Sequence, residues 1–444
     1  MNENPHADRL HEGHALLAAG KPAAALDAAH AVLAVTPDDA DGLHLAGMAL
    51  TMLGRRGEAL AVYARGHDLM PGAEGIACNM AGLLREMGRD ADAGAVYRTL
   101  LKTCPRSTEA LLGLTLSTAP RDDDLPDTLI HQLLDDDGLA ADKRTALLFA
   151  KANRHHWQGN YGAAILGYRE ANAYQRERDR PYDLDAYAQV ARMITQDLTD
   201  QVFAGAGHWG SDSTVPVFVA GLPRSGKTTL ESMITGHEAV HGAGELRLLQ
   251  DTAAEIEKKM TEAGPVRQLH RGTIDFRART FLAELRRRAP AAERIIDTNV
   301  NNLLLLGFAA LMFPRAPIIY CRREGMDIGL ACYTARFAGT QLYSTDLHDT
   351  GRFIRLGQDM WDHWKTAVPN PVLEVNFRDL TEQPDDTARQ VYGFLGLDGP
   401  VPDGHAGRQA TGIKFQAAAY ESHLNPLRDA LTGGDTDGET GGET

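Results

Sequence analysis

A 34-residue period in the first part of the chain constrains its fold more than any other sequence feature. Three sets of residues keep this step: Gly20, Gly54 and Gly88; Ala25, Ala59 and Ala93; Pro37, Pro71 and Pro105. A small residue five positions after each glycine lets two helices approach closely. Each proline ends a helix, because it has no backbone N–H to donate. The period therefore predicts helical hairpins that stack on one another.

This spacing resembles that of tetratricopeptide repeats, which are stacked helical hairpins. After Pro105 the phase slips, and a further hairpin is expected with its turn at residues 159–164. The resemblance implies an all-α solenoid over residues 7–185, whose surface could bind a peptide or protein partner. A Gly/Ser/Asp-rich stretch follows, and we expect a linker over residues 186–214.

From Val215 onward, short apolar runs alternate with helical stretches, which predicts an α/β domain with a parallel sheet. Strands are expected at Val215–Ala220, Arg294–Asp297, Pro317–Cys321 and Val372–Phe377. Helices are expected at Lys227–Thr235, Leu246–Met260, Ile274–Arg288, Asn301–Phe313 and Arg352–Ala367. The predicted domain spans residues 215–431. The acidic segment 432–444 lacks apolar residues and is predicted to be disordered.

Composition narrows the function classes. The 45 Lys+Arg against 60 Asp+Glu give a formal net charge of −15, which argues against a nucleic-acid partner. The longest apolar run, residues 303–313, is too short to span a bilayer. The first residues lack a basic segment followed by an apolar run, so we expect no signal peptide. The cysteines and histidines show no metal-binding spacing. These features predict a cytoplasmic protein without a metal site.

Residues 219–230 carry the strongest functional signal, a strand that ends in a glycine turn and continues as a helix. From Gly221 to Thr228 the residues fit the P-loop pattern G-x-x-x-x-G-K-T, which cradles nucleotide phosphates. The helix that follows points open N–H groups and the positive end of its dipole at an anion. The stretch therefore predicts an anion-binding site.

The same loop, read as Pro223-Arg224-Ser225-Gly226, resembles the 5′-phosphosulfate loop of sulfotransferases. Further motifs follow in order: His237, Gly244-Glu245-Leu246-Arg247, the segment from Phe313 to Arg323, Leu380 to Leu397, and Tyr420 to Leu427. In this order they make the chain similar to bacterial sulfotransferases fused to tetratricopeptide repeats. A more distant similarity is to tyrosylprotein sulfotransferases.

The resemblance implies a P-loop-like α/β/α domain that moves a sulfuryl group to an acceptor hydroxyl. The implied donor is 3′-phosphoadenosine-5′-phosphosulfate, and the acceptor is a protein, a glycan or a small molecule. Glu245 matches the family's general base, and Lys227 would act at the bridging oxygen or leaving group. The residues implied to bind the donor are Arg224, Ser225, Gly226, Lys227, Thr228, Thr229 and Lys414, with Arg323 as the ligand of the 3′-phosphate.

The chain departs from this family at three positions around the donor. Lys227 stands where the family has Thr, Thr298 where it has Lys, and Ala331 where it has Ser. In one interpretation the lysine cation has moved from position 298 to 227, and sulfuryl transfer is retained. In the other the donor is ATP or GTP with Mg²⁺, held by Lys227, Thr228 and Asp297 in a phosphotransferase. A third hypothesis is a non-catalytic scaffold built on the repeats.

Overall fold

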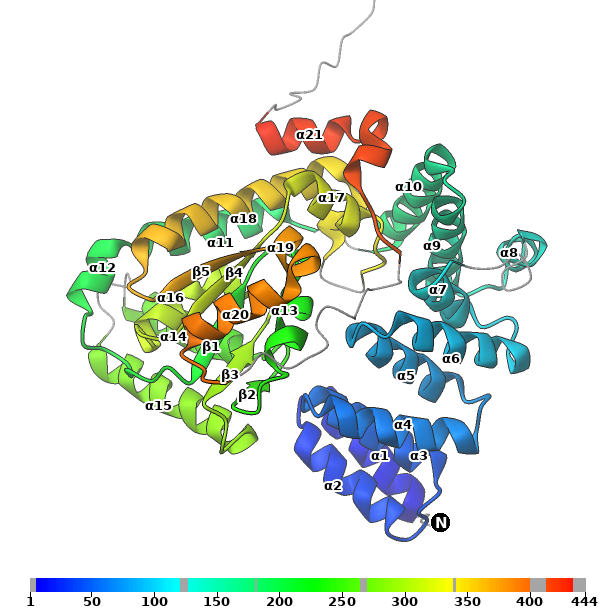
Figure 1. The fold of residues 1–444 in the computed structure, drawn as a ribbon, viewed down its shortest axis with the longest axis horizontal. Coiled ribbons are helices and arrows are strands. Elements are labelled where there is room, and N and C mark those ends of the chain that lie inside the picture. Colours follow the sequence, from blue (N-terminus) through cyan, green and yellow to red (C-terminus); the bar gives the residue numbers. More distant parts are fainter. Residues whose placement is uncertain are drawn as a thin grey trace, which may run out of the picture. The chain divides into compact units, whose positions relative to one another are not determined.

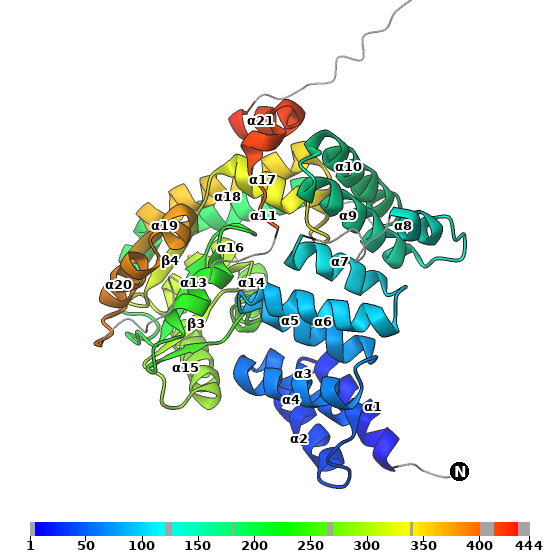
Figure 2. The same ribbon diagram turned by 45° about the vertical axis from the view of Figure 1, so that its right-hand side comes forward.

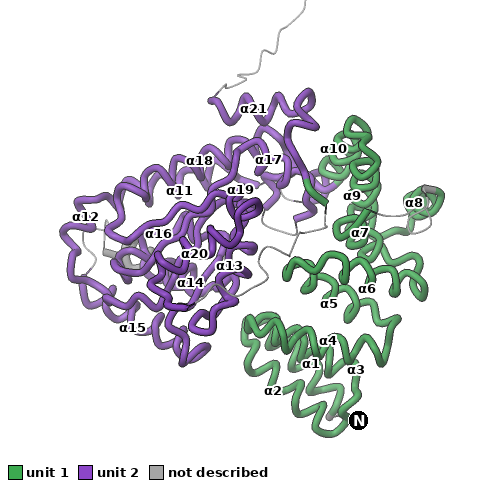
Figure 3. Tube along the Cα trace, viewed as in Figure 1, with its two compact units in different colours: residues 1–174, 408–414 green, residues 175–407, 415–444 purple. Residues whose placement is uncertain are grey.

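The structure, a computed structural model, describes residues 5–119, 127–179, 182–263, 270–337, 341–399 and 413–433. It divides into two compact units (Figure 3), the first made of Met1–Tyr174 and Arg408–Lys414, the second of Gln175–Gly407 and Phe415–Thr444. The division falls inside helix α10 (Tyr161–Arg178). Of the segment predicted to be disordered, residues 432–444, residues 434–444 lie outside the described part, whereas Thr432 is the last residue of a helix.

The first unit is all-helical, as predicted, and its helices pair into antiparallel hairpins (Figures 1 and 2). Its helices before α10 are α1 (Pro5–Ala18), α2 (Pro22–Leu33), α3 (Ala40–Met52), α4 (Arg56–Leu69), α5 (Glu74–Glu86), α6 (Asp90–Thr103), α7 (Thr108–Ser117), α8 (Asp127–Leu134) and α9 (Ala141–Trp157). Residues 158–160 separate α9 from α10, so the further hairpin is confirmed, although residues 161–164 of the predicted turn form the first turn of α10.

The period reflects one turn used repeatedly. Gly20, Gly54 and Gly88 separate the two helices of their hairpins with φ values of +68°, +74° and +71°, a left-handed conformation that glycine adopts without a Cβ penalty. Gly159 makes the same turn with φ +75°. The alanines five positions after the periodic glycines, Ala25, Ala59 and Ala93, are 0% exposed. The 34-residue spacing predicted the hairpins because it marks these turn glycines and these buried alanines.

The second unit contains a five-stranded sheet in the order β2-β3-β1-β4-β5, with every neighbouring pair parallel. The strands are β1 (Pro216–Ala220), β2 (Val240–Gly242), β3 (Arg294–Asp297), β4 (Ile318–Arg322) and β5 (Val372–Asn376). The helices are α11 (Leu184–Asp197), α12 (Asp200–Gly205), α13 (Lys227–Ile234), α14 (Leu248–Ala263), α15 (Arg271–Arg288), α16 (Asn302–Met312), α17 (Gly325–Tyr333), α18 (Leu347–Ala367), α19 (Phe377–Glu382), α20 (Pro384–Leu395) and α21 (Asn425–Thr432). The fold class predicted from the sequence is therefore confirmed.

Helices cover both faces of the sheet (Figure 1). Alternate residues of β1 serve the two faces, because strand side chains point to opposite sides in turn. Val217 and Val219 belong to a core cluster with residues of α13 and α20. Phe218 points the other way and packs with Phe281 and Phe313, at ring-centroid distances of 6.1 and 6.3 Å. The sheet is thus buried on both sides, as a parallel sheet requires.

All four predicted strands and all five predicted helices occur; β3 has the predicted ends, and the others differ at one or both ends. Strand β2 and helices α12, α17, α19, α20 and α21 were not predicted, and α11 and α12 occupy much of the expected linker over residues 186–214. The helix predicted from Arg352 begins earlier, at Leu347, because Asp346 caps it by accepting hydrogen bonds from the backbone N–H groups of His348 and Asp349 at 2.8 and 3.1 Å.

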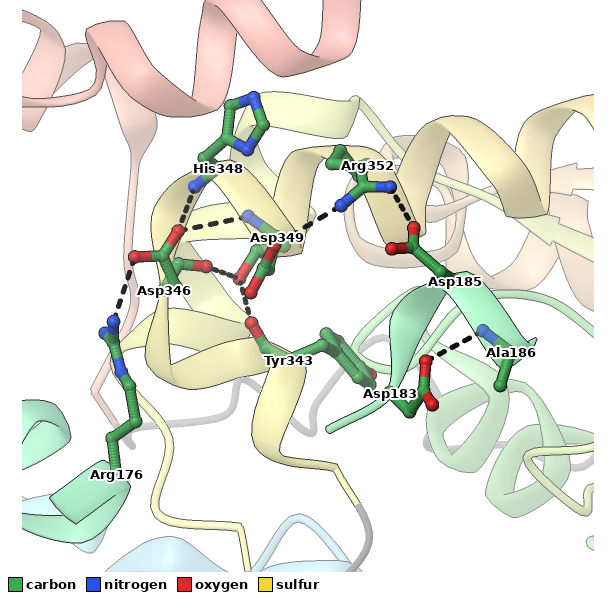
Figure 4. Close-up of polar contacts among 10 residues, drawn as sticks. Arg176, Asp183, Asp185, Ala186, Tyr343, Asp346, His348, Asp349 and Arg352 are labelled. Atoms are coloured by element: carbon green, nitrogen blue, oxygen red, sulfur yellow. Dashed lines mark hydrogen bonds and ion pairs between the residues drawn. The ribbon is translucent and has the colours of Figure 1, made fainter. Parts of the chain in front are cut away.

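Polar contacts fasten the segment 175–197 to the N-terminal half of α18 (Figure 4). Arg176 forms an ion pair with Asp346 at 3.3 Å, and Arg352 pairs with Asp185 of α11. The Tyr343 carbonyl, just before α18, accepts a hydrogen bond from the Thr350 hydroxyl at 3.1 Å. These contacts make α11 part of the second unit. Among the described residues, no helix combines the length and apolar character needed to cross a membrane.

Candidate functional site

The candidate site lies at the carboxyl edge of the sheet. Because all strands are parallel, the segments that follow β1, β2, β3 and β4 meet at one edge, where open α/β sheets bind ligands. These segments carry the predicted loop 221–226, Glu245, Asp297 with Thr298, and Arg323. The fold therefore brings residues more than 100 positions apart into one region.

The loop between β1 and α13 has a constrained backbone. Gly221 and Gly226 have φ values of +145° and +104°, and Arg224 has φ +66° without being glycine. A Cβ at Gly226 would lie 2.6 Å from Cδ2 of Phe377, so a larger residue does not fit there. No side chain caps α13, whose first N–H groups have no partner within the helix. The loop thus has the backbone of an anion cradle.

Lys227 is the first residue of α13, and its side chain reaches back into this loop. Its side chain is buried, and its Nζ donates a hydrogen bond to the carbonyl oxygen of Gly221 at 3.0 Å. Burial lowers the pKa of Lys227, and the charges of Glu245 and Asp297 counteract this effect. A cation in this position can stabilise negative charge on a ligand held by the loop.

Glu245 follows β2, and its carboxyl interacts electrostatically with the ammonium of Lys227. Although its side chain is exposed, the surrounding protein atoms desolvate the carboxyl and raise its pKa above the ordinary value. The nearby Lys227 ammonium lowers this pKa, and the carboxylate of Glu231 raises it further. A carboxylate with a raised pKa is a better proton acceptor than an ordinary one, which suits a general base.

Asp297 ends β3 beside the loop and is buried. Its Oδ1 accepts hydrogen bonds from the backbone N–H groups of Asn299 and Leu246, at 2.9 and 3.3 Å. Burial raises the pKa of Asp297 to about 7. The neighbouring Thr298 is also buried, and its N–H donates to the carbonyl oxygen of Gly244 at 3.0 Å. The segment after β3 therefore holds the segment that carries Glu245.

Arg323, just after β4, connects the loop to the next strand. Its Nη1 donates to the carbonyl oxygen of Arg224 at 2.9 Å, and its Cζ lies 4.3 Å from the ring centroid of Phe377. Partial burial lowers the pKa of Arg323, and the nearby positive charge of Arg224 lowers this pKa further. The same aromatic ring thus contacts Gly226 and stacks on Arg323.

Two buried polar atoms at this edge fit an anionic ligand. Within the described residues, the hydroxyl oxygen of Ser225 and Nε of Arg323 are buried without a hydrogen-bond partner. An unsatisfied buried donor costs free energy, and a phosphate or sulfate oxygen would satisfy it. Thr228 and Thr229, in the first turn of α13, are exposed and can contribute further hydroxyls.

Other predicted residues lie elsewhere. Lys414 belongs to the first unit, where its backbone accepts a hydrogen bond from His156, and its neighbour Ile413 donates to the Leu116 carbonyl at 3.1 Å. The structure does not group Lys414 with the loop, and its role as a donor ligand stays a prediction. Arg247 is exposed and pairs with Asp251 at 3.7 Å. Ala331 is buried in α17.

Sequence reasoning missed two residues of this edge. Glu231 of α13 is 1% exposed and accepts a hydrogen bond from Gly244 N at 2.8 Å. The sequence could have indicated Glu231 as a site residue, because it lies four positions after Lys227 on the same helix face. It also stands among the apolar residues Leu230, Met233 and Ile234. Phe377 had no such signal, because a phenylalanine at the end of a strand is ordinary core.

A polar cavity of about 220 Å³ lies beside these residues, at the ends of β4 and β5. Its walls are formed by Arg322, Glu374, Val375, Asn376, Asp379, Thr387 and Gln390. None of the residues of the loop from Gly221 to Thr229 lines it, so the chemistry is better located by the loop than by this cavity.

The sheet and its edge define a class of protein, an α/β domain whose glycine loop and following helix have the geometry to bind an anion. Residues 216–403 match the model of the Sulfotransferase family. The resemblance seen in the motifs is thereby confirmed. An uncharacterized protein of Aquifex aeolicus (strain VF5) is 26% identical over 227 residues, which are 49% of this chain but only 30% of the relative's length.

The chain also matches several solved structures. MamA from Desulfovibrio magneticus RS-1 is 17% identical and covers 40% of this chain and 100% of its own, with a TM-score of 0.30. The sulfotransferase domain of the Synechococcus PCC 7002 olefin synthase is 18% identical and covers 51% and 91%, with a TM-score of 0.31. Sulfotransferase STF1 from Mycobacterium tuberculosis H37Rv is 16% identical and covers 71% and 100%, with a TM-score of 0.30. These scores are low, so the fold assignment rests on the strand order of the sheet itself.

Proposed function

We propose that the second unit transfers a sulfuryl group from 3′-phosphoadenosine-5′-phosphosulfate to an acceptor hydroxyl. The observation that carries this proposal is the convergence of three charged side chains at one edge of the sheet. Lys227 and Glu245 interact electrostatically there, and Arg323 is hydrogen-bonded to the loop. Together they provide a cation, a base and an anion ligand for one reaction centre.

The residues divide the work as follows. Loop residues Arg224, Ser225 and Gly226 and the first turn of α13, with Thr228 and Thr229, bind the phosphosulfate end of the donor. Arg323 binds the 3′-phosphate, for which its guanidinium can offer two parallel N–H groups. In the family this ligand is assisted by a serine hydroxyl, and Ala331 removes that contact here.

Glu245 acts as the general base. Its carboxylate takes the proton of the acceptor hydroxyl while the acceptor oxygen bonds to sulfur, and the bond from sulfur to the bridging oxygen breaks. Adenosine 3′,5′-bisphosphate leaves. Lys227, buried within the loop, stabilises the negative charge that develops on the leaving oxygen. It thereby does from position 227 what the family's lysine does from position 298.

The alternative donor, ATP or GTP with Mg²⁺, requires Asp297 as a metal ligand. This carboxyl is buried, its Oδ1 is already used by two backbone N–H groups, and its raised pKa disfavours the charged form that a metal needs. These contacts favour a supporting role for Asp297 and therefore favour the sulfuryl donor.

Calorimetry separates the three hypotheses. We expect the full chain to bind adenosine 3′,5′-bisphosphate without Mg²⁺. Binding of ATP or GTP that requires Mg²⁺, with no response to the bisphosphate, would instead support the phosphotransferase. Binding of none of them would support the scaffold. Glu245→Gln should reduce turnover by about 10²- to 10⁴-fold and leave bisphosphate affinity near wild type.

The acceptor and the cellular setting are also proposed. An acceptor hydroxyl on a protein, a glycan or a small molecule fits a base at an open edge, and the helical hairpins of the first unit would bind a peptide or protein partner. We propose a cytoplasmic location, and we propose no nucleic-acid partner on the basis of the net charge of −15. A screen of phenols, sugars and tyrosine peptides with ³⁵S-labelled donor identifies the acceptor class.

A further inference from the structure

Four hydrogen bonds hold the backbone of Gly244 and Leu246, the residues on either side of Glu245. Gly244 N donates to Oε1 of Glu231 at 2.8 Å, and the Gly244 carbonyl accepts from Thr298 N at 3.0 Å. Leu246 N donates to Oδ1 of Asp297 at 3.3 Å, and the Leu246 carbonyl accepts from Nδ2 of Asn299 at 2.8 Å. Both neighbours of the proposed base are therefore fixed through both of their backbone polar groups.

These bonds come from two different elements. Thr298, Asp297 and Asn299 belong to the end of β3 and the segment after it, whereas Glu231 belongs to α13, the helix that begins with Lys227. Glu231 therefore ties the segment of the base to the helix that carries the anion-binding loop. A helix is stiff over one turn, so this bond fixes Glu245 relative to Lys227.

The local sequence accommodates this contact at two glycines. Gly244 has φ +66°, a left-handed conformation that glycine adopts without a Cβ penalty. A Cβ at Gly242 would lie 2.9 Å from Oε1 of Glu231 and 2.6 Å from Cγ2 of Thr235. The carboxyl of Glu231 thus occupies the space that the missing side chain of Gly242 leaves free. A buried carboxyl in such a place costs free energy unless its hydrogen bond is made.

We propose that Glu231 is a positioning residue, whose carboxyl holds Gly244 N and thereby places Glu245 against the anion-binding loop. The inference rests on the proposed function only in its use of Glu245 as the base. It assigns no contact between Glu231 and donor or acceptor.

The experiment compares Glu231→Ala and Glu231→Gln in the full chain. In Glu231→Ala the Gly244 N–H loses its acceptor, and we expect amide hydrogen exchange in segment 243–247 to rise by about 5- to 10-fold. Glu231→Gln keeps an oxygen that accepts the same bond and should retain wild-type protection. Gly242→Ala, which displaces the Glu231 carboxyl, should reproduce the exchange of Glu231→Ala.

Turnover is measured with 3′-phosphoadenosine-5′-phosphosulfate as donor and 4-nitrophenol as acceptor, at a pH on the activity plateau. We expect kcat of Glu231→Ala to fall by about 10- to 100-fold, while the affinity for adenosine 3′,5′-bisphosphate changes less than about twofold. Glu231→Gln should restore most of kcat. A general loss of stability would not separate kcat from donor affinity in this way.

Asn370→Ala is the matched control. Asn370 is also buried, and its Nδ2 donates to the carbonyls of Phe313 and Ala316 at 2.7 and 2.8 Å, away from the loop. It should lower stability without raising exchange in segment 243–247. Unchanged exchange in Glu231→Ala overturns the inference, as does raised exchange with wild-type kcat. A wild-type chain that shows no turnover with 4-nitrophenol or with any acceptor of the screen contradicts the proposed function instead, and the exchange result alone then tests the bond between Glu231 and Gly244.

Discussion

Nζ of Lys227 donates a hydrogen bond to the carbonyl oxygen of Gly221, 3.0 Å away, and this bond links the first residue of α13 to the start of the loop. Both residues belong to the P-loop pattern, yet the loop also carries the Pro-Arg-Ser-Gly order of sulfotransferases. The buried ammonium can exchange this carbonyl for a ligand oxygen, because the carbonyl is a neutral acceptor and the ligand is an anion. The lysine is thus placed to serve the same ligand as the loop.

A charge swap tests this assignment. Lys227→Thr restores the family's residue at 227 and should reduce kcat by about 10²- to 10³-fold, because the cation at the leaving oxygen is lost. Adding Thr298→Lys should recover at least about tenfold of that loss. Steady-state kinetics of the single and double variants measure both effects. If Thr298→Lys lowers kcat further in the double variant, the two positions do not share a function.

Most of the fold follows from short-range signals in the sequence. Gly20, Gly54 and Gly88 mark the hairpin turns by themselves, since a left-handed residue is needed there. Strand β2 escaped prediction because Val240–Gly242 has three residues, including His241 and a glycine, and owes its pairing to β3. Its existence depends on a neighbour that the local sequence does not contain.

The sequence indicated the residues that we propose to bind a ligand directly, and not the residues that support one another. Arg224, Lys227, Glu245 and Arg323 could be chosen from the order of the motifs. The bond between Glu231 and Gly244 joins residues 13 positions apart across a strand, and no motif records it. Phe377 stacks on Arg323 only because β4 and β5 are neighbours in the sheet.

The pH profile should have an acidic limb that belongs to Glu245. Desolvation raises the pKa of this carboxyl, so turnover is lost as the pH falls through a value above the ordinary glutamate range. Lys227 lowers this pKa and Glu231 raises it. Lys227→Met should therefore move the limb to higher pH, and Glu231→Gln should move it to lower pH. Profiles of kcat between pH 4 and 9 test this, and an unchanged limb in Glu245→Gln would assign it to another group.

Asp297 should make stability fall as the pH rises through the weakly acidic range. Burial raises its pKa from 3.8 to about 7, so the native state holds a proton that the unfolded state has released. Between pH 4 and 7 the wild type therefore loses stability relative to Asp297→Asn, whose amide oxygen still accepts from Leu246 N and Asn299 N. The gap should reach up to about 4 kcal/mol at neutral pH and vanish near pH 4. Urea unfolding at several pH values measures it, and a pH-independent gap would contradict the raised pKa.

Arg323 should distinguish donors by their 3′-phosphate. Arg323→Leu is expected to weaken binding of adenosine 3′,5′-bisphosphate by about 10- to 100-fold, because a charge-assisted hydrogen bond to phosphate is lost. Binding of adenosine 5′-phosphosulfate, which lacks that phosphate, should change much less. Phe377→Leu removes only the stacking on the guanidinium and should cost about two- to fivefold. Equal losses for both nucleotides in Arg323→Leu would place Arg323 at the other end of the donor.

Arg224 holds a left-handed backbone conformation, φ +66°, that favours glycine, and this strain persists at the anion loop. Arg224→Gly should relieve it and raise the free energy of unfolding by about 0.5–1 kcal/mol. The same change removes a guanidinium from the phosphosulfate end and should weaken bisphosphate binding by at least about tenfold. Arg224→Lys, the matched control, keeps the strain and the charge, so its stability should stay near wild type and its affinity should fall less. Thermal melts and calorimetry of the three proteins separate strain from binding. If Arg224→Gly is less stable than wild type, the side chain of Arg224 supports the loop itself, and its conformation is not a cost accepted for the ligand.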